Sequence, residues 1–204
     1  MAWDVERTKQ LLLDAATEEF SAFGMAGARI DRIAASAGVN KERIYQYFGK
    51  KSEFFGIVLE RQLAAVMDAV QITGTGVEAI SRYTADVFDY QIEHPQLARL
   101  TFWEGLECDR PTAEEKRRAA SDSKVVLVQK ALPSISQADA RDLLLTILTL
   151  ADGWQVLHTL DRLYTGTITR DDARNTSRKK AVVATIEALV RELDASPPPP
   201  SARR

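Results

Sequence analysis

Residues 28–51 read ARIDRIAASAGVNKERIYQYFGKK, and this stretch decides the fold. The apolar residues of its first half follow the i, i+3, i+4, i+7 spacing of one helix face: Ile30, Ile33, Ala34 and Ala37. Gly38 ends this helix, and Asn40 is a natural N-cap for a second short helix over 41–48. Two short helices joined by a glycine-containing turn predict a helix-turn-helix.

The helix expected over 41–48 is polar on one face. At about 100° per residue, Ile44 and Phe48 define its inward direction. The side chains that point nearly opposite are Glu42, Arg43 and Gln46. Tyr45 and Tyr47 lie about 80° to either side. A helix in the major groove needs donors and acceptors for base edges on its outer face and phosphate-binding groups on its flanks. The pattern therefore predicts a DNA-reading helix, although packing tyrosines and ordinary surface charges are the alternative.

Basic residues gather in the same stretch although the chain as a whole is acidic. The net charge is −2 and the sequence pI is about 5.8, which alone does not favour a nucleic-acid binder. Between residues 29 and 51, however, six cations stand against two anions: Arg29, Arg32, Lys41, Arg43, Lys50 and Lys51 against Asp31 and Glu42. This local excess suits contact with phosphates. On charge alone, an ordinary solvated surface explains it equally well.

Helices flank this stretch on both sides, and one clear joint follows them. Apolar spacing over 5–23 predicts a helix that Gly24 stops, and Ser52 is expected to cap a longer helix. The Thr73–Gly76 segment is the joint. We therefore predict an all-α chain in three parts: a three-helix helix-turn-helix domain over 1–52 with a linking helix over 52–72, a helical domain over 76–195, and a proline-rich extended tail over 196–204.

The second half of the chain also predicts helices and no strands. Their expected ranges are 77–93, 95–107, 111–132, 136–164 and 171–194. Residues 141–164 are apolar almost all round, so this helix must be buried on two sides. One side can be the core of its own domain, and a second copy of the chain is the simplest cover for the other. The alternative is a buried central helix in a monomer.

Composition disfavours several other classes of protein. Cys108 is the only cysteine, so neither a disulfide framework nor a cysteine-based zinc site is expected. His94 and His158 are too few to suggest a metal site, and no cofactor is expected. No apolar run reaches the roughly 18 residues of a membrane span. Met1–Gln10 lacks the apolar core of a signal peptide. We expect a cytoplasmic protein with no membrane partner.

The N-terminal part of the chain resembles the TetR family of bacterial transcriptional regulators. The resemblance covers about residues 5–65 and lies in Leu12-Leu13-Asp14-Ala15-Ala16, Phe20, Gly24, Ile33-Ala34, Ala37-Gly38-Val39, Ile44-Tyr45-Gln46-Tyr47-Phe48, Lys51 and Phe54-Phe55. The family typically shows an apolar-Tyr-x-His/Tyr-Phe segment followed by a lysine. The resemblance implies a TetR-like fold, in which a DNA-reading domain precedes a helical domain for ligand binding and dimerisation.

The resemblance also implies roles for residues of the helix-turn-helix. The positions that commonly contact the DNA backbone are taken by Tyr45, Tyr47 and Lys51. Those that commonly approach bases are taken by Lys41, Glu42 and Gln46. The chain departs from the family at Ala28-Arg29, where a Thr-Ser pair often provides a hydroxyl cap that binds a phosphate. Arg29 is expected to replace that contact by charge. The candidate DNA-binding residues are therefore Arg29, Lys41, Glu42, Arg43, Tyr45, Gln46, Tyr47 and Lys51.

Dimerisation and effector binding are expected in the second domain. In TetR-like proteins, helices corresponding to those near 141–164 and 171–193 form a four-helix dimer interface, which implies a homodimer. An effector pocket is expected between the helices of this domain, lined mostly by apolar and aromatic groups. Its candidate residues, each of which core packing also explains, are Phe88, Phe102, Trp103, Cys108, Trp154 and His158. Trp103 and Trp154 come first because large aromatic walls suit a flat apolar ligand.

The preferred hypothesis is a sequence-specific DNA-binding repressor. A homodimer would place two reading helices in successive major grooves of a near-palindromic operator. A small apolar or amphipathic ligand would release it by favouring a different spacing of the reading helices. Two alternatives stay open. One is an all-α enzyme, although no catalytic arrangement of residues stands out. The other is a helical protein-interaction module without DNA binding.

Overall fold

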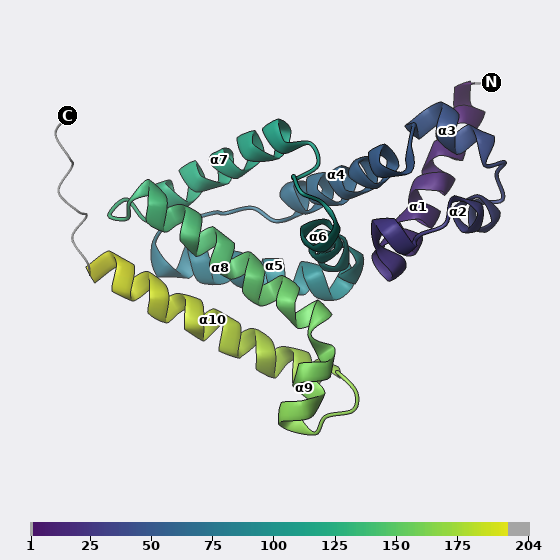
Figure 1. Cartoon of the computed structure of the whole chain (residues 1–204). Coiled ribbons are helices and arrows are strands. Elements are labelled where there is room, and N and C mark those ends of the chain that lie inside the picture. The colour runs from purple at the N-terminus through teal and green to yellow at the C-terminus, as the bar shows by residue number, and fades with distance from the viewer. Residues whose placement is uncertain (1, 196–204) are drawn as a thin grey trace. The chain divides into compact units, whose positions relative to one another are not determined.

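The computed structural model describes residues 2–195, and every helix or strand it contains in this range is an α-helix (Figure 1). The helices are α1 (Ala2–Gly27), α2 (Ile30–Ala37), α3 (Glu42–Phe48), α4 (Lys51–Ala69), α5 (Gly76–Glu93), α6 (Pro95–Glu107), α7 (Glu114–Ala131), α8 (Gln137–Val156), α9 (His158–Thr165) and α10 (Asp172–Ala195). The predicted all-α class is confirmed. The predicted tail over 196–204 lies outside the described residues.

The chain folds into two compact units. The first unit combines the residues up to Met67 with His94–Glu114. The second combines Asp68–Glu93 with the residues from Glu115 onwards. The first unit therefore contains α1 to α4 together with α6, and the second contains α5 and α7 to α10.

Hydrogen bonds to the backbone of α1 explain why α6 belongs to the first unit. Arg99 Nε and Trp103 Nε1 both donate to Ser21 O, at 2.8 and 3.2 Å respectively. The sequence predicts a single boundary at 73–76, with residues 95–107 in the second domain. The observed division differs because these bonds join residues far apart in the chain, which helical periodicity does not reveal.

Four phenylalanines form the centre of the first unit. Phe20 lies edge-on to Phe54 and Phe55, with ring centroids 5.8 and 5.3 Å apart, and Phe48 stacks on Phe54 at 4.3 Å. All four side chains are buried. Edge-on and stacked pairs of this kind add to the stabilisation from burial. Because Phe48 is the last residue of α3, this stacking fixes α3 against α4.

The start of α4 is capped by a different side chain from the one expected. Ser52 is exposed and lies inside the first turn of α4, so its predicted role as the cap is wrong. Instead, Glu53 Oε2 accepts a hydrogen bond from Lys50 N at 2.8 Å. Gly49 allows this close approach, because a Cβ there would lie 1.9 Å from Glu53 Oε2. A carboxylate is also favoured at this position by the helix dipole.

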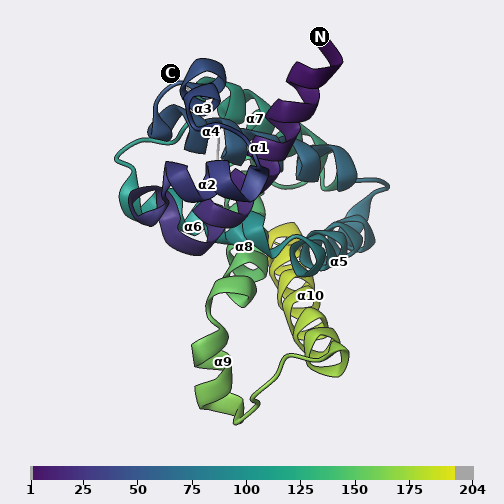
Figure 2. The same cartoon turned by 90° about the vertical axis from the view of Figure 1, so that its right-hand side faces the viewer.

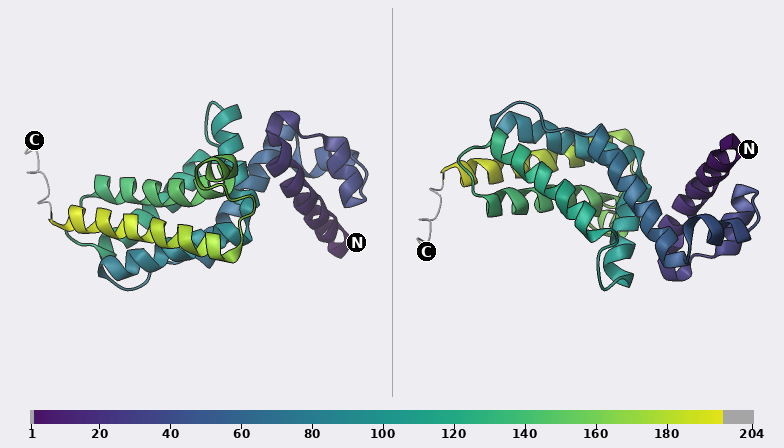
Figure 3. Two further views of the ribbon diagram at one scale, coloured as in Figure 1. Left: turned by 90° about the horizontal axis from the view of Figure 1, so that it is seen from below. Right: turned by 90° about the horizontal axis from the view of Figure 1, so that it is seen from above.

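Three helices, α5, α8 and α10, pack against one another in the second unit, and they lie side by side in Figures 1 and 3. Their shared apolar core consists of Ile80, Val87, Phe88, Leu143, Ile147, Val182, Ile186 and Val190. The predicted cap at Ser136 is confirmed: Ser136 Oγ accepts from Asp139 N at 3.1 Å, and Asp139 Oδ2 accepts from Ser136 N at 3.2 Å.

The continuous helix expected over 136–164 is broken, so that prediction is wrong. The break lies at Leu157, and Figure 2 shows α9 beyond the end of α8, followed by a loop that returns to α10. The guanidinium of Arg170 donates to Trp154 O, the carbonyl that the next helical turn would otherwise use. Among the described residues, no single helix could span a membrane; α8 and α9 meet the length and composition together, but they are bent by 78°.

Candidate functional site

A left-handed glycine and an asparagine side chain shape the turn between α2 and α3. Gly38 follows α2 with φ 64° and ψ 31°, a conformation that glycine adopts without a steric penalty. Asn40 Oδ1 then accepts a hydrogen bond from Glu42 N at 3.2 Å, which confirms the predicted capping role of Asn40. The turn reverses the chain within a few residues, so α2 packs while α3 presents an outer face.

The outer face of α3 has the predicted orientation. Ile44 and Phe48 are only 0% and 7% exposed and point into the first unit. The exposed residues at this helix are Lys41, Glu42, Arg43, Tyr45 and Gln46. Tyr47 is half-buried, whereas the side chain of Tyr45 is 54% exposed. This face therefore offers a carboxylate, a guanidinium and an amide between two phenol groups.

Two cations on this face have partners within the surface itself. Lys41 Nζ lies 3.2 Å from Asp31 Oδ1, and the hydrogen bond with Asp31, together with its charge, raises the pKa of Lys41. Arg43 Nη1 donates to the Tyr47 hydroxyl at 3.1 Å. Exposed pairs of this kind contribute little to stability. A phosphate can therefore compete with Asp31 for Lys41 at small cost.

Lys51 binds backbone carbonyl groups at the C-terminal end of α1 and just after it. Its ammonium group donates to Ala26 O at 3.1 Å and to Ala28 O at 3.3 Å. An ammonium group has three donors, so one remains for a phosphate. The contact that the family resemblance implies for Lys51 is thus compatible with this geometry. The two carbonyl bonds give Lys51 a folding role that the sequence pattern did not indicate.

Glu19 supplies the helix cap that is missing at Ala28-Arg29. Its Oε1 atom accepts from Arg29 N at 2.7 Å and from Arg32 Nε at 2.8 Å, and its side chain is only 10% exposed. The guanidinium of Arg32 also covers the ring of Phe23 at 4.2 Å. A carboxylate from α1 therefore binds the backbone at the start of α2, where Arg29 makes no side-chain capping bond of its own, and the side chain of Arg29 stays exposed.

Replacing Glu19 by alanine should lower the free energy of unfolding by about 1–2 kcal/mol, because an N-cap acceptor and the partner of Arg32 are lost together. Urea unfolding followed by circular dichroism measures this change. Glu6→Ala is the matched control, because Glu6 lies on the same helix and its side chain is paired with Lys9 at the surface, at 2.9 Å. Equal losses in the two variants would contradict the capping role.

The six candidate pocket residues are divided between the two units. Phe102, Trp103 and Cys108 lie on or directly after α6 in the first unit, whereas Phe88, Trp154 and His158 lie on α5, α8 and α9 in the second unit. In the first unit, Trp103 joins α6 to α1 through its hydrogen bond to Ser21 O. Burial, followed by the charges of Glu104, Glu107 and Asp109, raises the pKa of the Cys108 thiol. Among residues 2–195, no group of three His, Cys, Asp or Glu residues is placed to hold a metal ion.

A polar pair is buried beside the aromatic residues of the second unit. The rings of Phe88 and Trp154 lie 6.5 Å apart between centroids. On the same helices, Gln91 Nε2 donates to Asp152 Oδ1 at 2.6 Å, and both side chains are buried. Burial raises the pKa of Asp152 to about 7. Gln91 Oε1 is buried without a hydrogen-bond partner, so this region carries a polar group that its neighbours do not satisfy.

Arginines from the loop before α10 and from α10 itself cover the other side of Trp154. The guanidinium carbons of Arg170 and Arg174 lie 3.7 and 4.9 Å from the centre of the Trp154 ring system. Asp161 of α9 pairs with both of them. Trp154 Nε1 donates to Asn175 Oδ1 at 3.0 Å. Trp154 is predicted from the sequence but this basic cluster is not, because a helix break, α9 and a loop separate Trp154 from Arg170 and Arg174 in the chain.

Comparison with known proteins assigns both parts of the chain to one family. Residues 12–56 match the family described as "Bacterial regulatory proteins, tetR family". Residues 79–188, more than half of the chain, match "Tetracyclin repressor-like, C-terminal domain". The chain therefore belongs to the TetR family of bacterial transcriptional regulators. Members of this family are DNA-binding regulators rather than enzymes; they respond to small-molecule effectors and are typically dimeric.

Individual relatives are similar over parts of their length. The HTH-type transcriptional repressor SCO4008 of Streptomyces coelicolor is 44% identical over 106 residues, which cover 52% of this chain and 54% of that protein. The repressor NicS of Pseudomonas putida is 28% identical over 67% of this chain and 66% of that protein. The chain thus spans about half to two thirds of these relatives. The crystal structure of the putative transcriptional regulator SCO4942 of S. coelicolor has a TM-score of 0.72 and 28% identity, over 89% of this chain and 97% of that one.

Proposed function

We propose that this protein is a dimeric repressor that binds a near-palindromic operator through α3 and is released by a small effector bound in its second unit. The observation that carries the proposal is the outer face of α3, where base-reading and phosphate-binding groups are exposed together. Its proposed DNA-facing residues are Lys41, Glu42, Arg43, Tyr45, Gln46 and Tyr47. A short helix with this face, fixed by buried Ile44 and Phe48, fits a major groove.

Each group on this face has a role that its chemistry supports. Gln46 can bind adenine through both of its amide atoms, and Glu42 can accept a hydrogen bond from the amino group of cytosine. The hydroxyl of Tyr45 can donate to a phosphate on one wall of the groove. Arg29 contributes charge at the start of α2, where Glu19 has already taken the free backbone N–H group. Lys51 offers its one remaining donor.

The dimer is proposed to form through α8 and α10. On α8, Leu145 and Leu148 lie one turn apart and are 63% and 40% exposed. Exposed apolar side chains in such a row mark a surface that a partner covers. On the neighbouring helix, α10, small exposed residues permit close approach of a second copy: Ala181, Ala184 and Ala188. A two-fold axis through these helices would pair the same surface with itself.

The effector site is proposed beside Phe88 and Trp154, where Asp152 and Gln91 provide polar groups for a mainly apolar or amphipathic molecule. The unsatisfied Gln91 Oε1 supports a ligand that carries a hydrogen-bond donor. The protein is proposed to act in the cytoplasm, where the operator DNA is.

Titration of the full chain with a random-sequence duplex at increasing salt tests DNA binding. Affinity should fall steeply with salt because phosphate contacts release counterions, by roughly 10³-fold or more between 50 and 200 mM for six or more contacts. Tyr45→Phe, which removes one hydroxyl, should weaken binding about threefold to tenfold on every sequence. Tyr164→Phe is the control, because Tyr164 belongs to the second unit and is 88% exposed.

Sequence selection from a random DNA pool then tests base reading by the same chain. The selected motif should contain two inverted half-sites, and Gln46→Ala should change the preferred bases within each half-site. A chain whose binding is weak, insensitive to salt and unaffected by Tyr45→Phe would instead favour a protein-interaction role for α3.

A further inference from the structure

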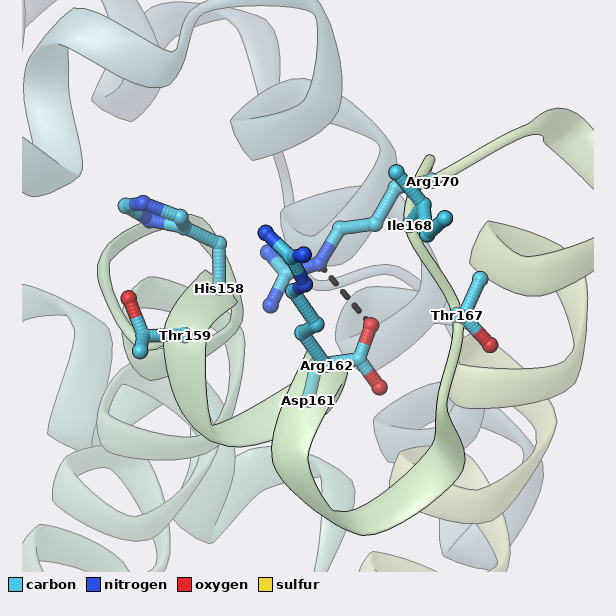
Figure 4. Close-up of a pocket in the computed structure, with 7 residues that line it drawn as sticks. All are labelled: His158, Thr159, Asp161, Arg162, Thr167, Ile168 and Arg170. Carbon is cyan, nitrogen blue, oxygen red and sulfur yellow. Dashed lines mark hydrogen bonds and ion pairs between the residues drawn. The ribbon is translucent and has the colours of Figure 1, made fainter.

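A small cleft lies between α9 and the loop that connects it to α10. Its volume is about 220 Å³, and it is lined by His158, Thr159, Asp161, Arg162, Thr167, Ile168 and Arg170 (Figure 4). Pockets for whole drug-sized ligands typically measure about 300–1,000 Å³. This cleft is therefore of a size for a small ion or for one functional group of a larger molecule.

Positive charge exceeds negative charge at the cleft. Arg162 and Arg170 both line it, and Arg174 approaches from α10 through its bond to Asp161. Asp161 is the one carboxylate in the lining, and it is shared between Arg170 and Arg174. The neighbouring Asp171 carboxylate accepts from Arg174 N at 2.8 Å and so caps α10. Two arginines and one carboxylate thus line the cleft, and Asp161 pairs with Arg170 and Arg174 but not with Arg162.

Arg170 is held in place while part of its guanidinium lacks an acceptor. Its Nε atom binds Asp161 Oδ2 at 3.1 Å, and its Nη1 atom donates to Trp154 O. Its face lies on the ring of Trp154 at 3.7 Å. Its Nη2 atom is buried without a hydrogen-bond partner. A guanidinium fixed on three sides with one unsatisfied donor is pre-organised for an acceptor.

Arg162 lines the same cleft and, unlike Arg170, is exposed (Figure 4). It follows His158 by four positions, so the two side chains begin on one face of α9. Rotamer changes of exposed side chains are fast, so Arg162 can move to share a ligand with Arg170. Two guanidinium groups on one cleft would repel each other unless an anion lies between them. The hydroxyl of Thr159 adds a donor at the rim, whereas the Nδ1–H group of His158 already donates to Val156 O at 3.2 Å.

We propose that this cleft is a binding site for a small oxyanion, either a free phosphate or the carboxylate of a small organic acid. Two oxygen atoms on one centre match the paired N–H groups of a guanidinium, which phosphate and carboxylate both exploit. The site belongs to the second unit, whereas the proposed DNA-facing residues of α3 belong to the first, and it adjoins Trp154, on whose ring Arg170 lies. Anion binding can therefore be measured in the absence of DNA.

An NMR titration of the full ¹⁵N-labelled chain tests the site. Inorganic phosphate and acetate are added separately at constant ionic strength, with chloride as the balancing anion. At least one of them should cause saturable shifts in the backbone signals of residues 158–170 and in the indole signal of Trp154, which lies under Arg170. Comparing the two titrations distinguishes a phosphate site from a carboxylate site.

Arg162→Gln should weaken anion binding at least tenfold. The chain should stay folded, because Arg162 is exposed. In Arg170→Gln, the saturable chemical-shift changes should disappear. Arg141→Gln is the control, since Arg141 is an exposed arginine of the same unit that pairs with Asp122 at 3.0 Å. Shifts that grow linearly with both anions, or equal affinities in the Arg162 and Arg141 variants, would overturn the proposal.

Discussion

Gly24→Ala should destabilise the first unit by about 3–5 kcal/mol, the largest loss expected from so small a change. Gly24 has φ 70° and ψ 179°, a region that only glycine occupies readily. A Cβ there would also lie 2.8 Å from Trp103 Cε3 and 2.6 Å from Glu107 Oε1. The methyl group would therefore force α6 away from α1. Urea unfolding monitored by circular dichroism measures the loss.

Gly38→Ala measures the cost of a positive φ alone, without the steric contacts that a Cβ at position 24 would make. Gly38 also has a positive φ, 64°, but a Cβ there would meet nothing within 4 Å. Only the left-handed conformation is penalised, at about 1–2 kcal/mol. If the two variants lose the same stability, the contact of Trp103 with Gly24 does not limit how closely α6 approaches α1.

Asp152→Asn should raise the free energy of unfolding by about 4 kcal/mol at about pH 8 and by only about 1–2 kcal/mol at about pH 5. Burial raises the pKa of Asp152 to about 7 in the folded chain, from an ordinary value of 3.8. The folded chain therefore holds a proton that the unfolded chain loses at lower pH. The contribution of Asp152 to stability is fully present below about pH 4 and is lost as the pH rises through about 7.

Asparagine keeps the acceptor for Gln91 Nε2 and adds an N–H group near the unsatisfied Gln91 Oε1, without a charge to bury. Thermal and urea unfolding across this pH range measure the effect. Asp142→Asn is the matched control, because Asp142 lies on the same helix and is exposed. A pH dependence that persists unchanged in Asp152→Asn would show that other groups cause it.

Local patterns predicted α3 and the turn before it well, because their determinants are close together in the sequence. The glycine at 38, the cap at Asn40 and the inward pair Ile44 and Phe48 all act within one or two helical turns. The apolar spacing of α2 likewise predicted its bounds. These features depend on backbone geometry and on helical period, which a short stretch of sequence determines.

Features that depend on distant residues escaped prediction. Lys51 reaches carbonyls more than twenty positions earlier in the chain, and α6 joins α1 across a still longer separation. At the break near Leu157, the carbonyl of Trp154 accepts from Arg170, which follows only after α9 and a loop. Apolar residues recur at helical spacing through residues 141–164 whether the helix is continuous or broken. This spacing therefore does not distinguish one long helix from two bent ones.

The cap that Glu19 provides for α2 has a consequence for how this chain tolerates mutation. The stability of the start of α2 depends on a residue of α1, ten positions before the backbone N–H group that it binds. Position 29 contributes only backbone groups to this helix start: its N–H donates to Glu19, and its carbonyl accepts from Arg32 N and Ile33 N. Many side chains can therefore occupy position 29 without loss of these bonds. Position 19 has no such freedom, because its carboxylate is itself the acceptor.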